Sequence, residues 1–114
     1  MSDCLFCKIV TGDIPATKIY EDDQVIAFND IDPKAPTHML IIPKQHISTL
    51  NDVEASHKAL IGHMVYTAKH LAKEHAHDEA GYRLVMNCNE DGGQTVYHLH
   101  MHLLAGRQMD WPPG

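Results

Sequence analysis

The sequence predicts an α+β fold in which a five-stranded antiparallel sheet carries one long helix and a short N-terminal helix. Two observations lead to this prediction. Five short segments are rich in β-branched and other apolar residues, whereas a single segment has a long helical repeat of apolar positions. Most connections are also too short for the helical crossovers that parallel strands require.

The N-terminal half is predicted to be mainly β-structure. A helical turn at 4–10 is interrupted by Gly12 and Pro15, and two prolines prevent regular structure in the loop at 32–36. The segment at 37–42 is nearly all apolar, which predicts a central position in the sheet. The strands expected in this half are 18–21, 25–29 and 37–42.

One long amphipathic helix is expected over residues 53–76. Its apolar residues recur at the 3.6-residue spacing of a helix, and Asn51 with Glu54 three positions later matches a capping box. The histidines on or just after this helix mostly fall off its apolar stripe and are expected to be solvated. They are His57, His63, His70, His75 and His77.

Two further strands are expected in the C-terminal part, at 82–88 and 96–104. Acidic residues and paired glycines at 89–93 predict a tight loop before the second of them. The tail at 107–114 contains two adjacent prolines and is not expected to be helical. It carries Trp111, the only tryptophan of the chain, and an exposed aromatic tail of this kind needs a partner surface.

The most informative segment is the predicted last strand. His98, His100 and His102 stand at every second position, so a strand places all three imidazoles on one face of the sheet. One explanation is a solvent-facing strand that happens to use histidine; the others are a metal site, a proton relay and a histidine nucleophile. The alternating residues are expected to be core: Leu99, Met101 and Leu103.

A glycine pair just before this strand suits an anionic ligand. Gly92 and Gly93 allow close approach of the backbone, whose N–H groups can face an anion, and Thr95 adds a hydroxyl donor. Hairpin turns use the same residues. The pair therefore indicates a phosphate site only in combination with the histidine strand that follows.

Composition excludes several partner classes. The chain has 114 residues, 44% of them hydrophobic, a net charge of −6 with histidine neutral, and no lysine- or arginine-rich block. We therefore expect a single domain over 1–114 that binds neither polymeric nucleic acid nor a membrane. The first residues lack the basic stretch and apolar run of a signal peptide, so a cytoplasmic location is expected.

Three cysteines are present: Cys4, Cys7 and Cys88. This odd number, in a reducing compartment, disfavours disulfides. The spacing of Cys4 and Cys7 then indicates metal or redox chemistry, because a Cys-x-x-Cys pair is half of a tetrahedral zinc site.

The segment His98-Leu99-His100-Met101-His102-Leu103-Leu104 resembles the motif of the histidine triad (HIT) family, in which three histidines alternate with apolar residues. Further segments resemble the Hint branch of this family in order and spacing over nearly the whole chain. They include Ala35-Pro36-Thr37-His38, Gly81-Tyr82-Arg83, Gly92-Gly93-Gln94 and the ending Trp111-Pro112-Pro113-Gly114.

The resemblance implies a homodimer whose two sheets join as one, and hydrolysis of the P–N bond of purine nucleoside phosphoramidates such as AMP–lysine. It implies His100 as the nucleophile that forms a nucleotidyl-histidine, with His102, His98 and His38 beside the phosphate and no cofactor needed for catalysis. The substrate contacts implied by position are Asp30 and Ile31 at the ribose, Leu5, Phe6, Ile9 and Phe28 at the base, Asn87, Gly93 and Thr95 at the phosphate, and Trp111 in a tail that reaches toward the partner's site.

Some bacterial HIT proteins that resemble this chain bind structural Zn²⁺ with two cysteines and two histidines. By position the ligands here would be Cys4, Cys7, His46 and His98. The alternative is two free thiols packed near the sheet, because other Hint proteins lack the pair and still fold. Zinc on His98 would fix the first imidazole of the triad and leave His100 and His102 for catalysis.

Two positions depart from the Hint pattern. Thr95 stands where serine is frequent and keeps the hydroxyl, whereas Asp110 stands where histidine is frequent and can alter the contribution of the tail to substrate choice. Two other functions stay open from sequence: a dinucleoside polyphosphate hydrolase, as in another HIT branch, and a non-catalytic nucleotide- or metal-binding partner module. The Trp111-Pro112-Pro113-Gly114 ending favours the Hint branch.

Overall fold

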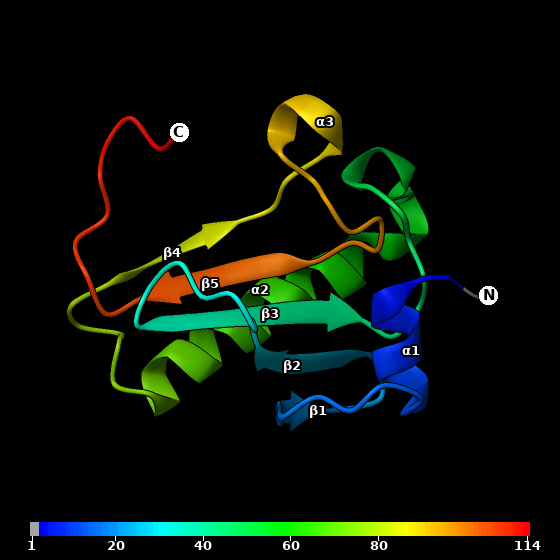
Figure 1. Cartoon of the computed structure of the whole chain (residues 1–114), viewed down its shortest axis with the longest axis horizontal. Helices are drawn as coiled ribbons and strands as arrows, with labels where there is room; N and C mark the ends of the chain where they lie inside the picture. The colour runs from blue at the N-terminus through cyan, green and yellow to red at the C-terminus, as the bar shows by residue number, and fades with distance from the viewer. Residues whose placement is uncertain (1–2) are drawn as a thin grey trace.

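The computed structural model describes residues 3–114, in which an antiparallel sheet of five strands has helices on both faces (Figure 1). The strands are β1 (Lys18–Glu21), β2 (Val25–Asn29), β3 (Thr37–Pro43), β4 (Tyr82–Val85) and β5 (Met101–Ala105). The helices are α1 (Leu5–Thr11), α2 (Lys58–Glu74) and α3 (Asn89–Gly92), with 3₁₀ turns at Leu50–Asp52 and Ala55–His57. The predicted α+β fold is therefore confirmed.

The strand order is β1-β2-β3-β5-β4, and every neighbouring pair is antiparallel. The apolar strand β3 lies in the middle, as its sequence predicts. Strands β1 and β4 form the edges, so β4 leaves one row of backbone groups unpaired within the described part of the chain.

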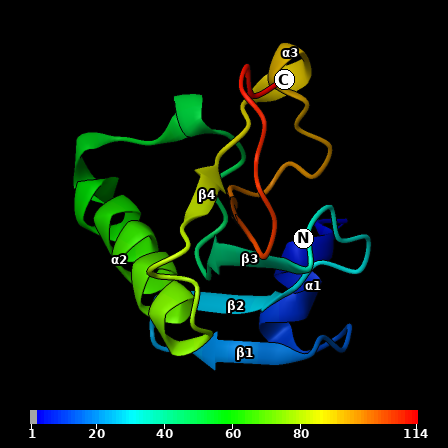
Figure 2. The same cartoon turned by 90° about the vertical axis from the view of Figure 1, so that its left-hand side faces the viewer.

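Helices α1 and α2 cover opposite faces of the sheet, and they lie on opposite sides of the strands in Figure 2. The alternation of side chains along the strands produces two separate apolar clusters. In β3, Met39 and Ile41 pack with α2, whereas Leu40 and Ile42 pack with Phe6 and Ile9 of α1. The face that carries α1 is also the face of the histidines, so this short helix forms one wall of the site.

The long helix begins later than its apolar repeat predicts. Thr49 and Asp52 form a capping box, in which the Asp52 carboxylate accepts bonds from the Thr49 amide and hydroxyl, and a 3₁₀ turn results. Val53 and Glu54 are extended, and a second 3₁₀ turn follows before α2 starts. The expected start at residue 53 with Asn51 as cap is therefore wrong, because local side-chain bonds compete with the helix there.

The strands expected at 82–88 and 96–104 are also shorter in the structure. Pro43 has no amide hydrogen, so the ladder between β3 and β5 stops near it, with Ile41 opposite Met101 as its last pair. Strand β4 then loses its partner beyond Val85. The tight loop expected at 89–93 contains the short helix α3. Within residues 3–114, no helix combines the length and apolar character needed to cross a bilayer.

Candidate active site and metal centre

The three histidines lie on the α1 face of the sheet, although only His102 belongs to β5. The ring of Phe6 makes edge-to-face contacts with His98 and His100, at centroid distances of 6.0 and 5.2 Å. The ring of His102 lies 5.0 Å from that of His100. The intervening residues pack in the cluster under α2: Leu99, Met101 and Leu103. The predicted alternation therefore holds across the whole segment.

His100 is held in one tautomer by the backbone. Its Nδ1 lies 2.7 Å from the carbonyl oxygen of His98, and a carbonyl only accepts, so Nδ1 carries the hydrogen. The Nε2 atom of neutral His100 then has a free lone pair. Within residues 3–114, Thr67 Oγ1 is the one fully buried side-chain nitrogen or oxygen that lacks a hydrogen-bond partner. His100 Nε2 also lacks a partner, so it is not fully buried and solvent reaches it. The arrangement suits a nucleophile.

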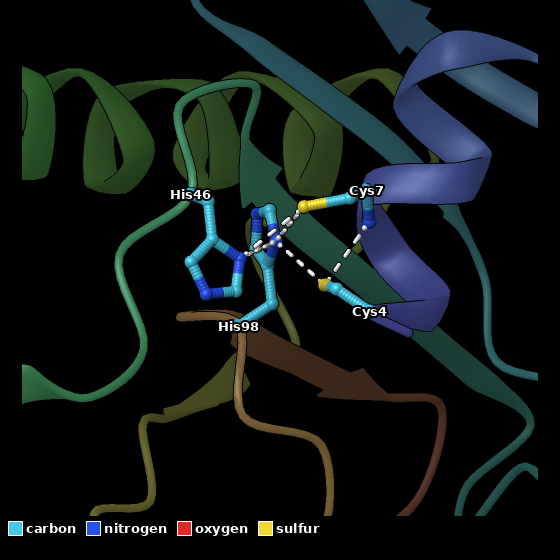
Figure 3. Close-up of side chains that lie close together, drawn as sticks. All are labelled: Cys4, Cys7, His46 and His98. Carbon is cyan, nitrogen blue, oxygen red and sulfur yellow. Dashed lines mark hydrogen bonds between the residues drawn. The ribbon is translucent and has the colours of Figure 1, made fainter. Parts of the chain in front are cut away.

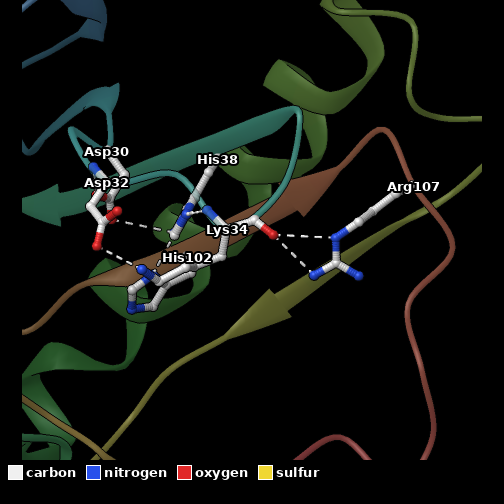
Figure 4. A network of polar contacts seen from close by, with 6 residues as sticks. All are labelled: Asp30, Asp32, Lys34, His38, His102 and Arg107. Atoms are coloured by element: carbon white, nitrogen blue, oxygen red, sulfur yellow. Dashed lines mark hydrogen bonds and ion pairs between the residues drawn. The ribbon is translucent and has the colours of Figure 1, made fainter.

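A second pair of imidazoles joins β3 to β5. Leu40 lies opposite His102, which places His38 diagonally across from it on the same face. His38 Nε2 and His102 Nδ1 are 2.9 Å apart, and an Asp30 carboxylate oxygen lies 3.5 Å from the same His38 nitrogen (Figure 4). The distance between the imidazoles is that of a hydrogen bond.

The direction of this hydrogen bond follows from the loop above it. The amide of Lys34 donates to His38 Nδ1 over 3.0 Å, so that nitrogen has no hydrogen of its own. Neutral His38 therefore carries its hydrogen on Nε2 and donates it to His102 Nδ1. The hydrogen of neutral His102 is consequently on Nε2.

The site favours neutral imidazoles. Burial, together with the nearby rings of His100 and His38, lowers the pKa of His102 to about 4. Burial also lowers the pKa of His38, partly offset by the negative charge of Asp30. His102 is thus uncharged at neutral pH in the free protein, because desolvation penalises the cation.

A second cluster combines two thiols and two imidazoles at the N-terminus of α1 (Figure 3). His98 Nδ1 lies 3.3 Å from Cys4 Sγ, 3.5 Å from Cys7 Sγ and 3.2 Å from His46 Nδ1. Cys7 Sγ lies 3.2 Å from His46 Nδ1. All four donor atoms lie within 4.8 Å of one another.

These distances fit a tetrahedral zinc site. Ordinary Zn–N and Zn–S bond lengths place two nitrogen ligands about 3.3 Å apart and a nitrogen and a sulfur about 3.6 Å apart. The orientation of His98 fits as well, because its Nε2 donates to the Pro43 carbonyl over 2.8 Å. Its Nδ1 lone pair therefore faces both sulfur atoms and His46, and a backbone carbonyl orients it as is usual for a metal-ligating histidine.

The local backbone explains why the two thiols converge. Cys4 is the N-cap of α1, and its Sγ accepts a hydrogen bond from the Cys7 amide over 3.2 Å. The first helical turn then places both sulfur atoms on one side. Burial and the adjacent Cys4 side chain raise the pKa of Cys7 to about 11, so a metal that binds there displaces a proton. Cys88, the third cysteine, lies outside this cluster.

The glycine loop is shaped by a residue that sequence reasoning did not single out. Gln94 is buried, donates to the Ser48 and Val96 carbonyls, and accepts from the Asn89 amide. Gly93 follows the last residue of α3 and has a φ of +84°, a backbone conformation that favours glycine. No hydrogen bond within residues 3–114 joins Gly93 or Thr95 to the triad, and both are exposed. Asn87 is half-buried nearby in the chain.

The residues implied at the base and ribose fall into two groups. Phe6, Ile9 and Phe28 are buried in the apolar cluster between α1 and the sheet, where the Phe6 and Phe28 rings meet edge-to-face with their centroids 5.6 Å apart. The second group has side chains that are exposed or partly exposed, so a ligand can reach them from solvent. Its members are Leu5, Asp30, Ile31 and Trp111. Ile31 is almost fully exposed at 99%.

Comparison with known proteins places the chain in a family. A model of the HIT domain matches residues 11–109, so the chain belongs to the HIT family. The purine nucleoside phosphoramidase of Escherichia coli is 50% identical over 94% of this chain and 90% of its own. A 14 kDa zinc-binding protein of Zea mays is 49% identical over 99% of this chain and 89% of its own. The crystal structure of a HIT family hydrolase from Legionella pneumophila is 57% identical, with a TM-score of 0.97 over 98% of this chain and 100% of that one.

Proposed function

We propose that this protein is a hydrolase that cleaves the P–N bond of purine nucleoside phosphoramidates through a nucleotidyl-histidine. The observation that carries the proposal is the free Nε2 lone pair of His100, oriented by the His98 carbonyl. The similarity to a purine nucleoside phosphoramidase supports the substrate class. A neutral imidazole is a competent nucleophile near pH 7.

In the first step, His100 Nε2 attacks the α-phosphorus and the P–N bond breaks. The leaving nitrogen must gain a proton, and His102 Nε2 is the donor that we assign to it. Both ring nitrogens of His98 are already engaged, which favours His102 over His98 in this role. A phosphoryl group beside His102 adds negative charge, which raises the pKa of this imidazole and makes its protonated form available.

In the second step, water hydrolyses the nucleotidyl-histidine. His102 has lost its Nε2 proton in the first step, so its lone pair accepts a proton from the attacking water. The P–N bond to His100 then breaks, and AMP and free His100 result. Amide groups near Gly93 and the Thr95 hydroxyl are assigned to the phosphoryl oxygens, where donors stabilise developing charge.

Zinc is proposed at Cys4, Cys7, His46 and His98 as a structural ion. When bound, it would cross-link the start of α1 to the segment before β5. This link would stabilise the position of His98, whose imidazole belongs to the cluster and whose carbonyl orients His100. The similarity to a zinc-binding plant protein supports this assignment.

The remaining assignments complete the proposal. A homodimer is supported by the edge strand β4 and by exposed Val65 and Tyr66 on α2, which leave apolar and backbone groups for a second copy. Asp30 and Ile31 are assigned to the ribose. Base contacts are assigned to Leu5, Phe6, Ile9 and Phe28, Asn87 to the phosphate, and Trp111 to the neighbouring subunit's site.

Turnover of a fluorogenic AMP–amine tests the function, with a dinucleoside polyphosphate as the competing substrate. We expect wild type to hydrolyse the amine conjugate far faster than the polyphosphate, and His100→Ala to hydrolyse neither. Preference for the polyphosphate would assign the protein to another HIT activity. Equal lack of turnover by wild type and His100→Ala, with AMP bound by both, would indicate a binding module.

A further inference from the structure

Arg107, which follows β5, makes an unusual contact with the loop between β2 and β3. Its Nε and Nη2 atoms both donate to the carbonyl oxygen of Lys34, over 3.2 and 3.0 Å (Figure 4). Its third nitrogen, Nη1, donates to the Gln108 carbonyl over 3.1 Å. Within residues 3–114 this guanidinium pairs with no carboxylate, so its hydrogen bonds go to backbone instead.

The residue that Arg107 holds is the one that orients His38. Lys34 offers its carbonyl to the arginine and its amide to His38 Nδ1, from the two sides of one Cα atom. Holding the carbonyl therefore limits rotation of the amide. Most of the surrounding loop is exposed, although Ala35 is buried and the Asp32 amide donates to Asp30 Oδ1 over 2.8 Å. The Lys34 side chain contacts Asp32 at 2.6 Å. The Lys34 carbonyl itself is held by the two bonds from Arg107.

We propose that Arg107 is a positioning residue that clamps Lys34 and thereby keeps His38 with its hydrogen on Nε2, facing His102. This inference rests on the proposed function, in which His102 gives a proton to the leaving amine. The chain of contacts runs from the guanidinium through Lys34 and His38 to His102.

The clamp has a chemical consequence. Protonated His102 must carry a hydrogen on Nδ1, which then meets the hydrogen on His38 Nε2. The pair can avoid this clash by moving the His38 hydrogen to Nδ1, but the Lys34 amide blocks that nitrogen. The clamp therefore disfavours a second proton on His102 and keeps its single hydrogen on Nε2, the nitrogen assigned to the leaving amine.

Other groups also act on this pair and set the size of the effect. Asp30 lies 3.5 Å from His38 Nε2 and favours the same tautomer. Asp32 and the Lys34 side chain act on His38 with opposite charges, and His100 lies beside His102. Arg107 is thus one of two supports for the His38 tautomer, and its loss should weaken this tautomer preference without abolishing it.

The first test measures the tautomer in the free, full-length protein. Nitrogen-15 NMR of the His38 and His102 rings is compared in wild type, Arg107→Ala, Arg107→Lys and the matched tail control Gln108→Ala. We expect wild type and Gln108→Ala to have His38 protonated on Nε2, Arg107→Ala to mix both tautomers, and Arg107→Lys to restore part of the wild-type signal. An unchanged tautomer in Arg107→Ala would overturn the proposal.

The second test measures the pH dependence of turnover. In the proposed function His102 gives its proton to the leaving nitrogen, so the pKa of His102 sets the alkaline limb of the kcat–pH profile. Because Arg107→Ala relaxes the restraint against protonated His102, this limb should move to higher pH on AMP–alkylamine and less on AMP–arylamine, which needs less help from a proton to leave. AMP affinity and Tm should stay unchanged. An unshifted alkaline limb would make Arg107 a tether of the tail only and overturn the proposal.

The two tests separate this inference from the function on which it rests. If wild type turned over neither amine conjugate, the proposed function would fail, while the NMR comparison would still decide whether Arg107 sets the His38 tautomer. If wild type were active and Arg107→Ala kept the wild-type kcat–pH profile and His38 tautomer, only the inference would fail.

Discussion

The carbonyl oxygen of His98 accepts a 2.7 Å hydrogen bond from His100 Nδ1, so the first histidine of the triad orients the second through its backbone. Its side chain meanwhile belongs to the thiol–imidazole cluster and is fixed by the Pro43 carbonyl. One residue therefore connects the candidate metal centre to the candidate nucleophile. Metal binding and the tautomer of His100 are expected to be coupled.

Replacing the nucleophile should separate chemistry from binding. His100→Ala removes the attacking nitrogen, so phosphoramidase activity should fall to background. AMP affinity should stay within a few-fold of wild type, because the phosphate and base contacts assigned above do not include this side chain. Calorimetric titration with AMP and a thermal melt check both points. Activity within a few-fold of wild type would sink the assignment of His100.

Zinc should be present at about one ion per chain, as expected of a single four-ligand site. Elemental analysis of protein purified without chelator measures this directly. Cys7→Ser should lose the ion and lower Tm, because it removes a ligand next to His46 and His98. Cys88→Ser is the matched control, since Cys88 lies outside the cluster, and it should keep the ion. Wild-type protein that takes up no added zinc would refute this site.

The triad is the part of the candidate site that the sequence predicts best. Period-2 spacing predicts that its three imidazoles share one face, and it does so even where no strand forms, because the extended backbone alternates there as well. The resemblance implied only that His38 and His102 lie beside the same phosphate. Their contact joins residues that are 64 positions apart and requires the register of β3 on β5.

Contacts through backbone atoms left no sequence signal. Arg107 and Lys34 are 73 positions apart, and the acceptor is a carbonyl that every residue possesses, so no residue type marks the pair. The predicted start of the long helix α2 is wrong for a local reason. The apolar repeat continues upstream, but Thr49 and Asp52 satisfy each other's backbone and side-chain groups in a 3₁₀ turn.

Acid should destabilise the protein partly through His102. Its pKa is about 4 in the folded chain and about 6.5 in an unfolded one, so between these values the unfolded state binds more protons. The free energy of unfolding should therefore be fully retained above about pH 6.5 and fall as the pH drops toward 4. Urea denaturation at pH 7, 5.5 and 4.5 measures this decline.

His102→Gln provides the control for that decline, because it removes the titrating ring while the candidate zinc ligands and their own acid sensitivity stay the same. The loss of stability between pH 7 and pH 4.5 should be smaller in this variant. An identical loss in wild type and His102→Gln would mean that the imidazole contributes nothing to acid sensitivity.

The C-terminal tail should tune the choice of leaving group in a homodimer. Arg83 holds the tail by donating to the Asp110 carbonyl over 3.0 Å, with its guanidinium 5.7 Å from the centre of the Trp111 ring. The tryptophan nevertheless remains 79% exposed on its own subunit. Proline on its C-terminal side restricts the chain, so the ring can reach a second subunit at low entropic cost.

Two truncations divide the tail's contributions. Deleting 107–114 removes Trp111 together with the Arg107 clamp, whereas deleting 109–114 removes Trp111 and keeps Arg107. Both should change the ratio of kcat/KM between two AMP–amine substrates severalfold with AMP affinity little altered, and only the longer deletion should also change the His38 tautomer. Sedimentation should find a dimer for wild type at micromolar concentration. A monomer there, or an unchanged ratio after the shorter deletion, would exclude a role for Trp111 in the neighbouring site.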